Sequence, residues 1–211
     1  MKNSVVIFVG VLTEYQGVDV LMEAVPHVVQ KVPESKFLIV GYPNEEHYRQ
    51  RARDLGVQSR VHFTGKISYE DVPRYLSLAD IAVSPKLSST EANLKLFTYM
   101  AMGLPTVVFD NPVNREILGD VGVYAETVDS TALAEALIRV LKDKEWAKHL
   151  GMRSRQKAVE EYSWSVMGKR LGDIYNSVRE KQHGSSKEHA HAKIEDIGHR
   201  GRRFYGFPSN K

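Results

Sequence analysis

The sequence contains no cysteine and no apolar run long enough to cross a bilayer. Without cysteine, thiol catalysis, disulfide bonds and cysteine metal sites are excluded. The apolar run near the N-terminus, residues 5–12, is too short to span a membrane, and no small-residue cleavage pattern follows it. We therefore predict a strand there and not a signal peptide. These absences fit a cytoplasmic location, with peripheral contact to the cytoplasmic membrane face left open.

Neither sign of charge is in large excess. The chain has 29 Lys and Arg residues against 26 Asp and Glu residues, a net charge of +3. These charges are mixed along the predicted helices and do not gather on one stripe, so nucleic-acid binding is not predicted. With 211 residues, of which 42% are hydrophobic, the chain can form one good core but is short for two domains.

Short β-branched runs alternate with longer amphipathic segments along most of the chain. The runs predict strands at residues 5–10, 36–41, 60–65, 81–85, 105–109 and about 121–124. The amphipathic segments predict helices at residues 17–32, 45–56, 68–80, from Glu91 onward, 113–118, 130–141, 144–161 and 164–180. Pro26 predicts a kink or a break in the first helix. Alternating strands and helices imply an α/β fold: a doubly wound parallel sheet in a Rossmann-like single domain.

The composition changes near the C-terminus. Residues 183–211 are polar, poor in aliphatic side chains, and hold four of the eight histidines. Such a segment cannot bury much surface, so we predict a folded domain at residues 1–182 and a disordered tail at residues 183–211. His189 and His191 lack companion ligands at a convincing spacing, and no metal site is predicted.

The loops that follow the predicted strands are the first place to look for a site. Doubly wound sheets bind ligands outside the carboxyl ends of their strands. Three predicted strands end in glycine, at Gly10, Gly41 and Gly65. Glycine lets the backbone approach a ligand, or it simply makes a tight turn; the sequence leaves both alternatives open.

One stretch, from Ser84 to Asp120, combines a Ser/Thr-rich loop with an apolar helix. Glu91, Asn93 and Lys95 stand at the head of that predicted helix. A helix that only packs in a core needs none of these polar groups. A site that holds a charged ligand would use all three, because free backbone N–H groups and the helix dipole favour anions at a helix start.

Several segments in this order resemble the C-terminal, donor-binding domain of the GT-B fold glycosyltransferases of group 1, or family 4. They read FVGVLTEYQGVDVLMEA, FLIVGYPN, VHFTGKISYEDVPRYLSLADIAVSP, EANLKLFTYMAMGLPTVVFDNPVNREIL, TALAEALIRVLKD and EEYSWSVMGKRLGDIY. The most specific is AMGLPTVV after a helix headed by glutamate. The resemblance implies one half of a GT-B fold that binds a nucleotide diphosphate sugar as donor substrate, retains anomeric configuration, and needs no metal or other cofactor.

The resemblance also implies positions for the donor. Glu91 stands where the family's first motif glutamate contacts the donor sugar, so it is the candidate catalytic residue, with Asn114 and Glu116 as further sugar contacts. The positions expected at the diphosphate are Gly10, Gln16, Gly17, Lys86, Asn93, Leu94, Lys95 and Tyr99. The positions expected at the nucleotide base are Gly41, Tyr42, Gly65, Lys66 and Ile67.

Three positions depart from the family pattern. Val11 and Gln16 replace the arginine and lysine that usually meet the diphosphate, and Tyr99 replaces the second motif glutamate. We infer that Lys95, with Lys86, supplies the missing charge. The alternatives are that Lys95 pairs with Glu91 on a helix surface and that Lys86 is solvated. For Asn93 the alternative to contact with the donor is that it caps the helix, and for Tyr99 the alternative is that it lies in the core.

A GT-B enzyme has a second domain that binds the acceptor, and this chain begins almost at the first strand of the donor domain. We therefore expect a hexosyltransferase half that needs an acceptor-binding domain or partner subunit. Trp164, Met167, Leu171 and Ile174 would contact that partner or pack on this domain itself. The alternative is a non-catalytic nucleotide-binding or interaction module, which the uncharged Val11 and Gln16 favour.

Overall fold

The computed structural model describes residues 4–179. The chain divides into two compact units, Met1–Tyr162 and Ser163–Lys211. The second unit is helical over residues 164–179. The predicted domain boundary at residues 182 and 183 and the predicted tail lie outside the described residues. Within those residues no helix is both long and apolar enough to cross a bilayer.

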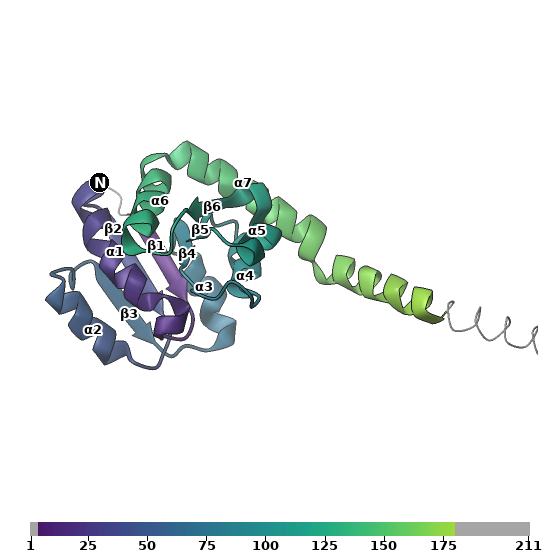
Figure 1. Cartoon of the computed structure of the whole chain (residues 1–211), viewed down its shortest axis with the longest axis horizontal. Helices are drawn as coiled ribbons and strands as arrows, with labels where there is room; N and C mark the ends of the chain where they lie inside the picture. Colours follow the sequence, from purple (N-terminus) through teal and green to yellow (C-terminus); the bar gives the residue numbers. More distant parts are fainter. Residues whose placement is uncertain (1–3, 180–211) are drawn as a thin grey trace, which may run out of the picture. The chain divides into compact units, whose positions relative to one another are not determined.

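The first unit is built on one parallel sheet (Figure 1). Its strands are β1 (Ser4–Val9), β2 (Ser35–Val40), β3 (Val61–Gly65), β4 (Ile81–Ser84), β5 (Thr106–Phe109) and β6 (Gly122–Ala125). They lie in the order β3-β2-β1-β4-β5-β6, and every adjacent pair is parallel. This is the doubly wound order of Rossmann-like folds, so the predicted fold class is confirmed.

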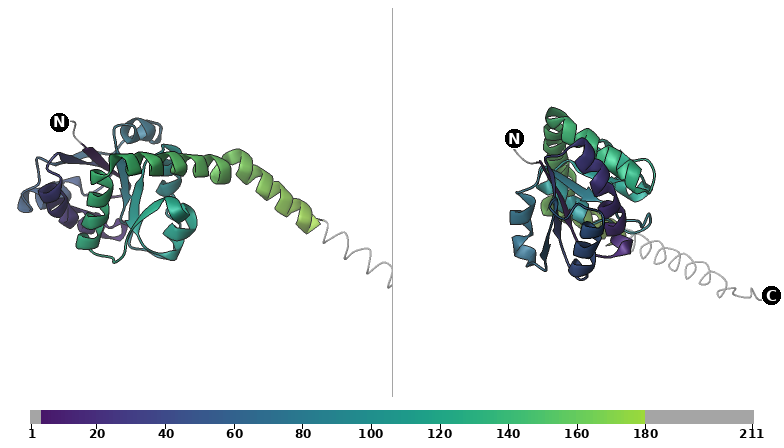
Figure 2. Two further views of the ribbon diagram at one scale, coloured as in Figure 1. Left: turned by 90° about the horizontal axis from the view of Figure 1, so that it is seen from above. Right: turned by 90° about the vertical axis from the view of Figure 1, so that its left-hand side faces the viewer.

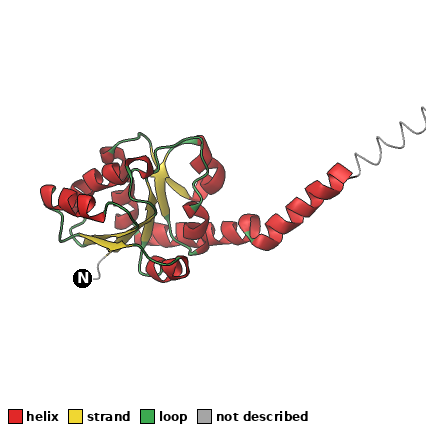
Figure 3. Cartoon of the chain, turned by 90° about the horizontal axis from the view of Figure 1, so that it is seen from below, coloured by secondary structure: helices red, strands yellow, loops and turns green. Residues whose placement is uncertain are grey.

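Helices cover both faces of the sheet (Figures 2 and 3). The α-helices are α1 (Val18–Lys31), α2 (Glu45–Asp54), α3 (Val72–Leu76), α4 (Lys95–Ala101), α5 (Pro112–Leu118), α6 (Ser130–Lys142) and α7 (Lys144–Tyr162). Short 3-10 turns lie at Glu14–Gln16, Tyr69–Asp71 and Gly119–Val121. One core contains α1, α2 and α6, the other contains α3, α4 and α5, and α7 contributes to both.

The central strands β1, β4 and β5 are mostly apolar because side chains on both of their faces are buried. In β1, Val6 and Phe8 pack into one core and Ile7 into the other. Such strands read as continuous apolar runs in the sequence. The predicted break at Pro26 is wrong, since α1 continues through Pro26 to Lys31. Val25 and Val28 on either side of Pro26 are fully buried, and this packing holds the helix together.

Two predicted helices have different ends in the structure. The helix expected from Glu91 begins only at Lys95, and the helix expected up to residue 80 ends at Leu76. Ser68 caps the turn at Tyr69–Asp71, because its hydroxyl accepts a hydrogen bond from the Asp71 amide. Glu91 therefore lies in the loop between β4 and α4 and not on a helix.

Candidate functional site

The candidate site lies at the carboxyl ends of β1 and β4, where the strand order reverses. Crevices at such switch points are the ligand sites of open α/β sheets. The loop after β1 and the loop after β4 touch there. Gly17 starts α1 with a φ of 73°, and a Cβ atom at this position would lie 1.8 Å from the carbonyl oxygen of Pro85. Only glycine allows both this conformation and this close approach.

Lys95 extends from the first turn of α4 toward the loop after β1. Its ammonium nitrogen donates a hydrogen bond of 2.8 Å to Oε1 of Gln16 and lies 4.4 Å from the centre of the Phe8 ring. A Cβ atom at Gly10 would lie 2.8 Å from the same nitrogen, so Gly10 leaves room for it. Three residues predicted for the diphosphate, Gly10, Gln16 and Lys95, are thus brought together.

The ammonium of Lys95 is poorly compensated. Among residues 4–179 it forms no ion pair with a carboxylate, and its one side-chain acceptor, Gln16, is neutral. Burial first, and the positive charge of Lys86 second, lower the pKa of Lys95 to about 7. An anion bound beside Lys95 would offset both effects.

Lys86, Glu91 and Tyr15 form a second cluster beside the first. Lys86 is only 6% exposed and donates to a carboxylate oxygen of Glu91 at 3.2 Å and to the carbonyl of Ala92 at 3.3 Å. The Tyr15 hydroxyl donates to the same carboxylate. Tyr15 first, and Lys86 second, hold the pKa of Glu91 below its usual range. The cluster fixes an ionised carboxylate at an exposed position.

This cluster overturns two of the alternatives. Lys86 is not a solvated surface lysine, and Lys95 does not pair with Glu91. The physical reason is the late start of α4: Glu91 does not lie one helical turn before Lys95. Tyr15 was not predicted from the sequence, although it precedes Gln16 in one of the strand-end loops.

Asn93 and Asn114 lie in the interior. Each is 2% exposed, and their side chains form a chain of hydrogen bonds. Ser84 donates to Asn93 at 3.1 Å, Asn93 donates to Asn114 at 3.1 Å, and Asn114 donates to the carbonyl of Phe109 at 2.9 Å. These hydrogen bonds join the ends of β4 and β5 next to the loop that carries Glu91. We therefore assign both asparagines to the structure around the site and not to ligand contact, and Asn93 does not cap α4 with its side chain.

Tyr99 is also an interior residue. It is 1% exposed, and its hydroxyl accepts a hydrogen bond of 2.9 Å from the Val9 amide. Burial raises its pKa above the usual value. This position agrees with the core alternative and removes Tyr99 from the residues that could reach a donor.

The residues predicted for the base lie at the ends of β2 and β3. A Cβ atom at Gly41 would lie 1.8 Å from the carbonyl oxygen of Gly10, so the loops after β1 and β2 are in contact. Tyr42 is 46% exposed, and the Lys66 ammonium lies 5.0 Å from the centre of its ring. Ile67 is partly buried in the core. An exposed aromatic face beside a cation is suited to stacking with a nucleobase.

The remaining candidates are exposed. Leu94 is 71% exposed just before α4, and Glu116 lies at the surface of α5. The helix predicted at residues 113–118 is α5, which begins one residue earlier, at Pro112. Pro112 occupies its first turn, and Asn111 caps it by accepting a hydrogen bond of 2.8 Å from the Asn114 amide.

Comparison with known proteins identifies the family of this chain. The family model described as "Glycosyl transferases group 1" matches residues 3–143. The chain belongs to the group 1 glycosyltransferases. It is 30% identical over 176 residues to a phosphatidyl-myo-inositol mannosyltransferase of Mycobacterium leprae, a match that covers 82% of this chain and 46% of the relative. It is 27% identical over 177 residues to an alpha-D-kanosaminyltransferase of Streptomyces kanamyceticus, covering 82% and 46%. The chain thus spans about half the length of these relatives.

Solved structures show the same fold. Anabaena HepE in complex with UDP and glucose is 19% identical with a TM-score of 0.73, covering 83% of this chain and 49% of that one. Sucrose-phosphate synthase from Thermosynechococcus elongatus is 23% identical with a TM-score of 0.71, covering 85% and 46%. The Rossmann-like unit of this group 1 glycosyltransferase chain therefore matches one half of GT-B structures, as predicted.

Proposed function

We propose that this chain is the donor-binding half of a retaining glycosyltransferase that uses a nucleotide diphosphate sugar. The observation that carries the proposal is Lys95, a cation at the switch point whose side-chain partner is the neutral Gln16. A diphosphate would supply the missing negative charge through charge-assisted hydrogen bonds. Lys95 would thus replace the charge that the family pattern places at positions 11 and 16.

The other residues of the site suggest how the donor lies. The diphosphate would sit between Lys95, Gln16 and the backbone at Gly10, and the sugar would face Glu91. The carboxylate of Glu91 is held by Tyr15 and Lys86, so its oxygens are oriented to accept hydrogen bonds from the hydroxyl groups of a sugar. The base would extend toward Tyr42 and Lys66.

The chemistry of the proposed reaction needs positive charge at the leaving group. When the bond between the anomeric carbon and the diphosphate breaks, negative charge develops on the departing phosphate oxygen. The ammonium of Lys95 would stabilise that charge in a partly buried setting, where such interactions are strong.

The acceptor would be bound by another domain or subunit. A hexosyl donor agrees with the names of the mannosyltransferase relatives. The cytoplasmic location and the peripheral membrane contact stay predictions.

Calorimetric titration of the purified chain with UDP, GDP, UDP-glucose and GDP-mannose tests the proposal. We expect saturable binding to one of the two nucleotide series. Lys95→Ala should weaken it roughly tenfold or more, because a charged hydrogen bond contributes about 1.5–3 kcal/mol. Lys31→Ala removes an exposed lysine of α1 and should leave binding unchanged.

Each other outcome has a distinct meaning. Binding that Lys95→Ala does not change would keep the donor domain and overturn the role of Lys95. Absence of any binding would favour the second candidate, a non-catalytic interaction module. That candidate is favoured by Gln16, which carries no charge at a position where the family pattern has a lysine.

A further inference from the structure

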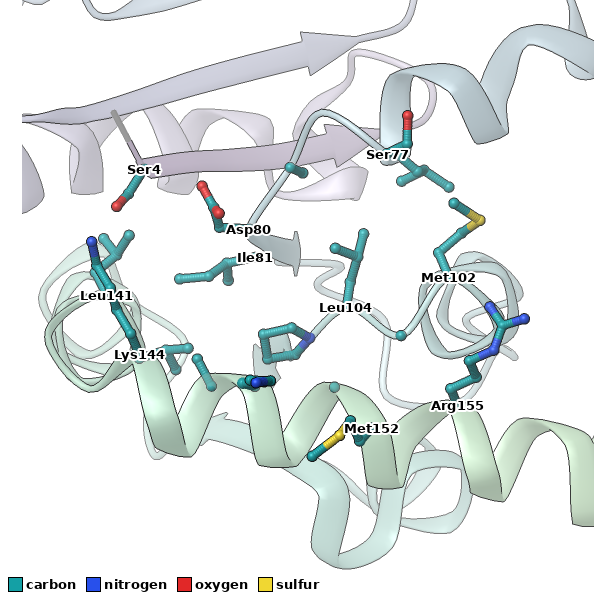
Figure 4. Close-up of a pocket in the computed structure, with 18 residues that line it drawn as sticks. Ser4, Ser77, Asp80, Ile81, Met102, Leu104, Leu141, Lys144, Met152 and Arg155 are labelled. Atoms are coloured by element: carbon teal, nitrogen blue, oxygen red, sulfur yellow. The ribbon is translucent and has the colours of Figure 1, made fainter. Parts of the chain in front are cut away.

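A cavity of about 630 Å³ lies at the amino ends of the strands, opposite the candidate donor site, where β1, β4 and β5 begin (Figure 4). Its floor is formed by the first residues of these strands and by the turns that precede them, including Ser4, Ile81 and Leu104. This volume is within the range of roughly 300–1,000 Å³ that is typical of sites for small molecules. None of its lining residues belongs to the candidate donor site.

One face of α7 forms the wall across from the strands. Lys144, Ala147, Lys148, Gly151 and Arg155 recur at helical spacing along this face and all line the cavity. At Gly151 the helix backbone is pressed against the chain, since a Cβ atom there would lie 2.2 Å from the carbonyl oxygen at position 103. One turn earlier, Ala147 also lines the cavity, and its side chain is only a methyl group.

The charges around the cavity are unequal. Lys144, Lys148 and Arg155 contribute three cations, and Asp80 is the one carboxylate among the lining residues. That carboxylate already accepts a hydrogen bond of 2.8 Å from the Val5 amide. Neither lysine forms an ion pair within residues 4–179, whereas Arg155 donates to the carbonyl of Ala101 at 2.8 Å. The lining therefore has an excess of positive charge, and two of its cations, Lys144 and Lys148, have no ion-pair partner in the described part of the chain.

The rest of the lining is largely apolar. Ile81, Leu104, Val140 and Leu141 line the cavity between the strand starts and the end of α6. We propose that this cavity binds a small anion with an apolar body, which packs against Ile81 and Leu104 while its charged group pairs with Lys144 and Lys148. The proposal does not rest on the donor site, because it concerns the other edge of the sheet.

Binding of two probes to the full chain tests this site: the fluorescent dye anilinonaphthalene sulfonate and dodecyl phosphate. We expect one saturable site for each, with dodecyl phosphate displacing the dye and UDP-glucose leaving it bound. Lys144→Glu/Lys148→Glu should weaken both probes at least tenfold. Lys31→Glu/Arg53→Glu changes the net charge equally on α1 and α2 and should have no effect.

A second variant keeps the test independent of charge. Ala147→Phe fills the cavity and should abolish dye binding, with circular dichroism and a melting curve confirming that the variant folds. Equal affinity of wild type and Lys144→Glu/Lys148→Glu would overturn the proposal, as would an unchanged affinity in a folded Ala147→Phe variant. Binding to phosphatidylglycerol-containing vesicles that needs the same two lysines would support the site and identify a lipid as the source of the anion.

Discussion

At the scale of single residues, Lys95 carries most of the functional argument. From the sequence alone it reads equally well as a phosphate ligand or as half of a surface ion pair. The structure places its ammonium beside Gln16 and over the Phe8 ring, and within residues 4–179 it forms no ion pair. A partly buried cation with a neutral partner is costly, and such a group gains the most when an anion binds.

The pKa of about 7 predicts that donor binding depends on pH. The ammonium form is lost as pH rises through this value, whereas a bound diphosphate raises the pKa and favours that form. The affinity for UDP-glucose or GDP-mannose should therefore fall roughly tenfold or more between about pH 6.5 and about pH 8.5. Nucleotide sugars suit the titration because their diphosphate diesters do not titrate in this range. Lys95→Met should bind weakly with no pH dependence; a matching slope in this variant would contradict the role of Lys95.

At the scale of elements, two loops determine the shape of the site. The loop after β4 is held from below by the hydrogen bonds of Asn93 and Asn114. The loop after β1 is held against it by the contact between Gly17 and Pro85. Apart from the 3-10 turn at Glu14–Gln16, both loops lie outside regular structure, so their positions depend on such contacts between elements.

Replacement of Asn114 tests the first contact. Asn114→Leu removes the hydrogen bonds that Asn114 makes with the buried Nδ2 group of Asn93 and with the carbonyl of Phe109, at a cost of about 1–3 kcal/mol for each group left unsatisfied. Urea unfolding should show this loss. The double variant Asn93→Leu/Asn114→Leu should cost less than the sum of the two single variants, because residues in one network are not additive. Strict additivity would mean that the two amides act independently.

A pair of glycine variants tests the second contact. Gly17 and Gly56 both have positive φ, 73° and 68°, but a Cβ atom at Gly56 would meet nothing within 4 Å. Gly56→Ala should therefore cost only the conformational strain, about 1–2 kcal/mol. Gly17→Ala adds a clash with the Pro85 backbone and should be clearly less stable in urea unfolding. Equal losses would show that the two loops separate easily.

At the scale of the whole molecule, the two edges of the sheet have different chemistry. The carboxyl edge presents Lys95 and an oriented Glu91, which suits a charged donor with hydroxyl groups. The amino edge presents an apolar cavity with an excess of cations. Two ligands of different class should therefore bind at opposite ends of the same strands.

Hydrogen–deuterium exchange distinguishes binding at the carboxyl ends of the strands from binding at their amino ends. A nucleotide sugar should slow exchange in residues 10–17 and 85–96. Dodecyl phosphate should slow exchange in residues 76–80, 102–105 and 144–155. Since the two sets do not overlap, protection of both edges by either ligand would contradict the assignment of separate sites.

The family and the fold followed from the sequence because both depend on local patterns. The apolar runs predict buried strands, and segments such as AMGLPTVV identify the family. The first turn of α5 was predictable for the same reason, since Asn111 and Pro112 act on neighbouring backbone groups. The start of α4 was not, because the interior position of Asn93 depends on Ser84 and Asn114 from other elements.

The sequence by itself determined a doubly wound α/β unit, its group 1 glycosyltransferase family, and a set of loops where a donor would bind. Only the tertiary structure decided which side chains face that site. It placed Lys95 against Gln16, paired Lys86 with Glu91, and turned Tyr99 into the core. The periodicity of a sequence indicates which face of one helix or strand is buried. Ion pairs and burial at the ends of the strands depend instead on distances between loops that are far apart in the sequence.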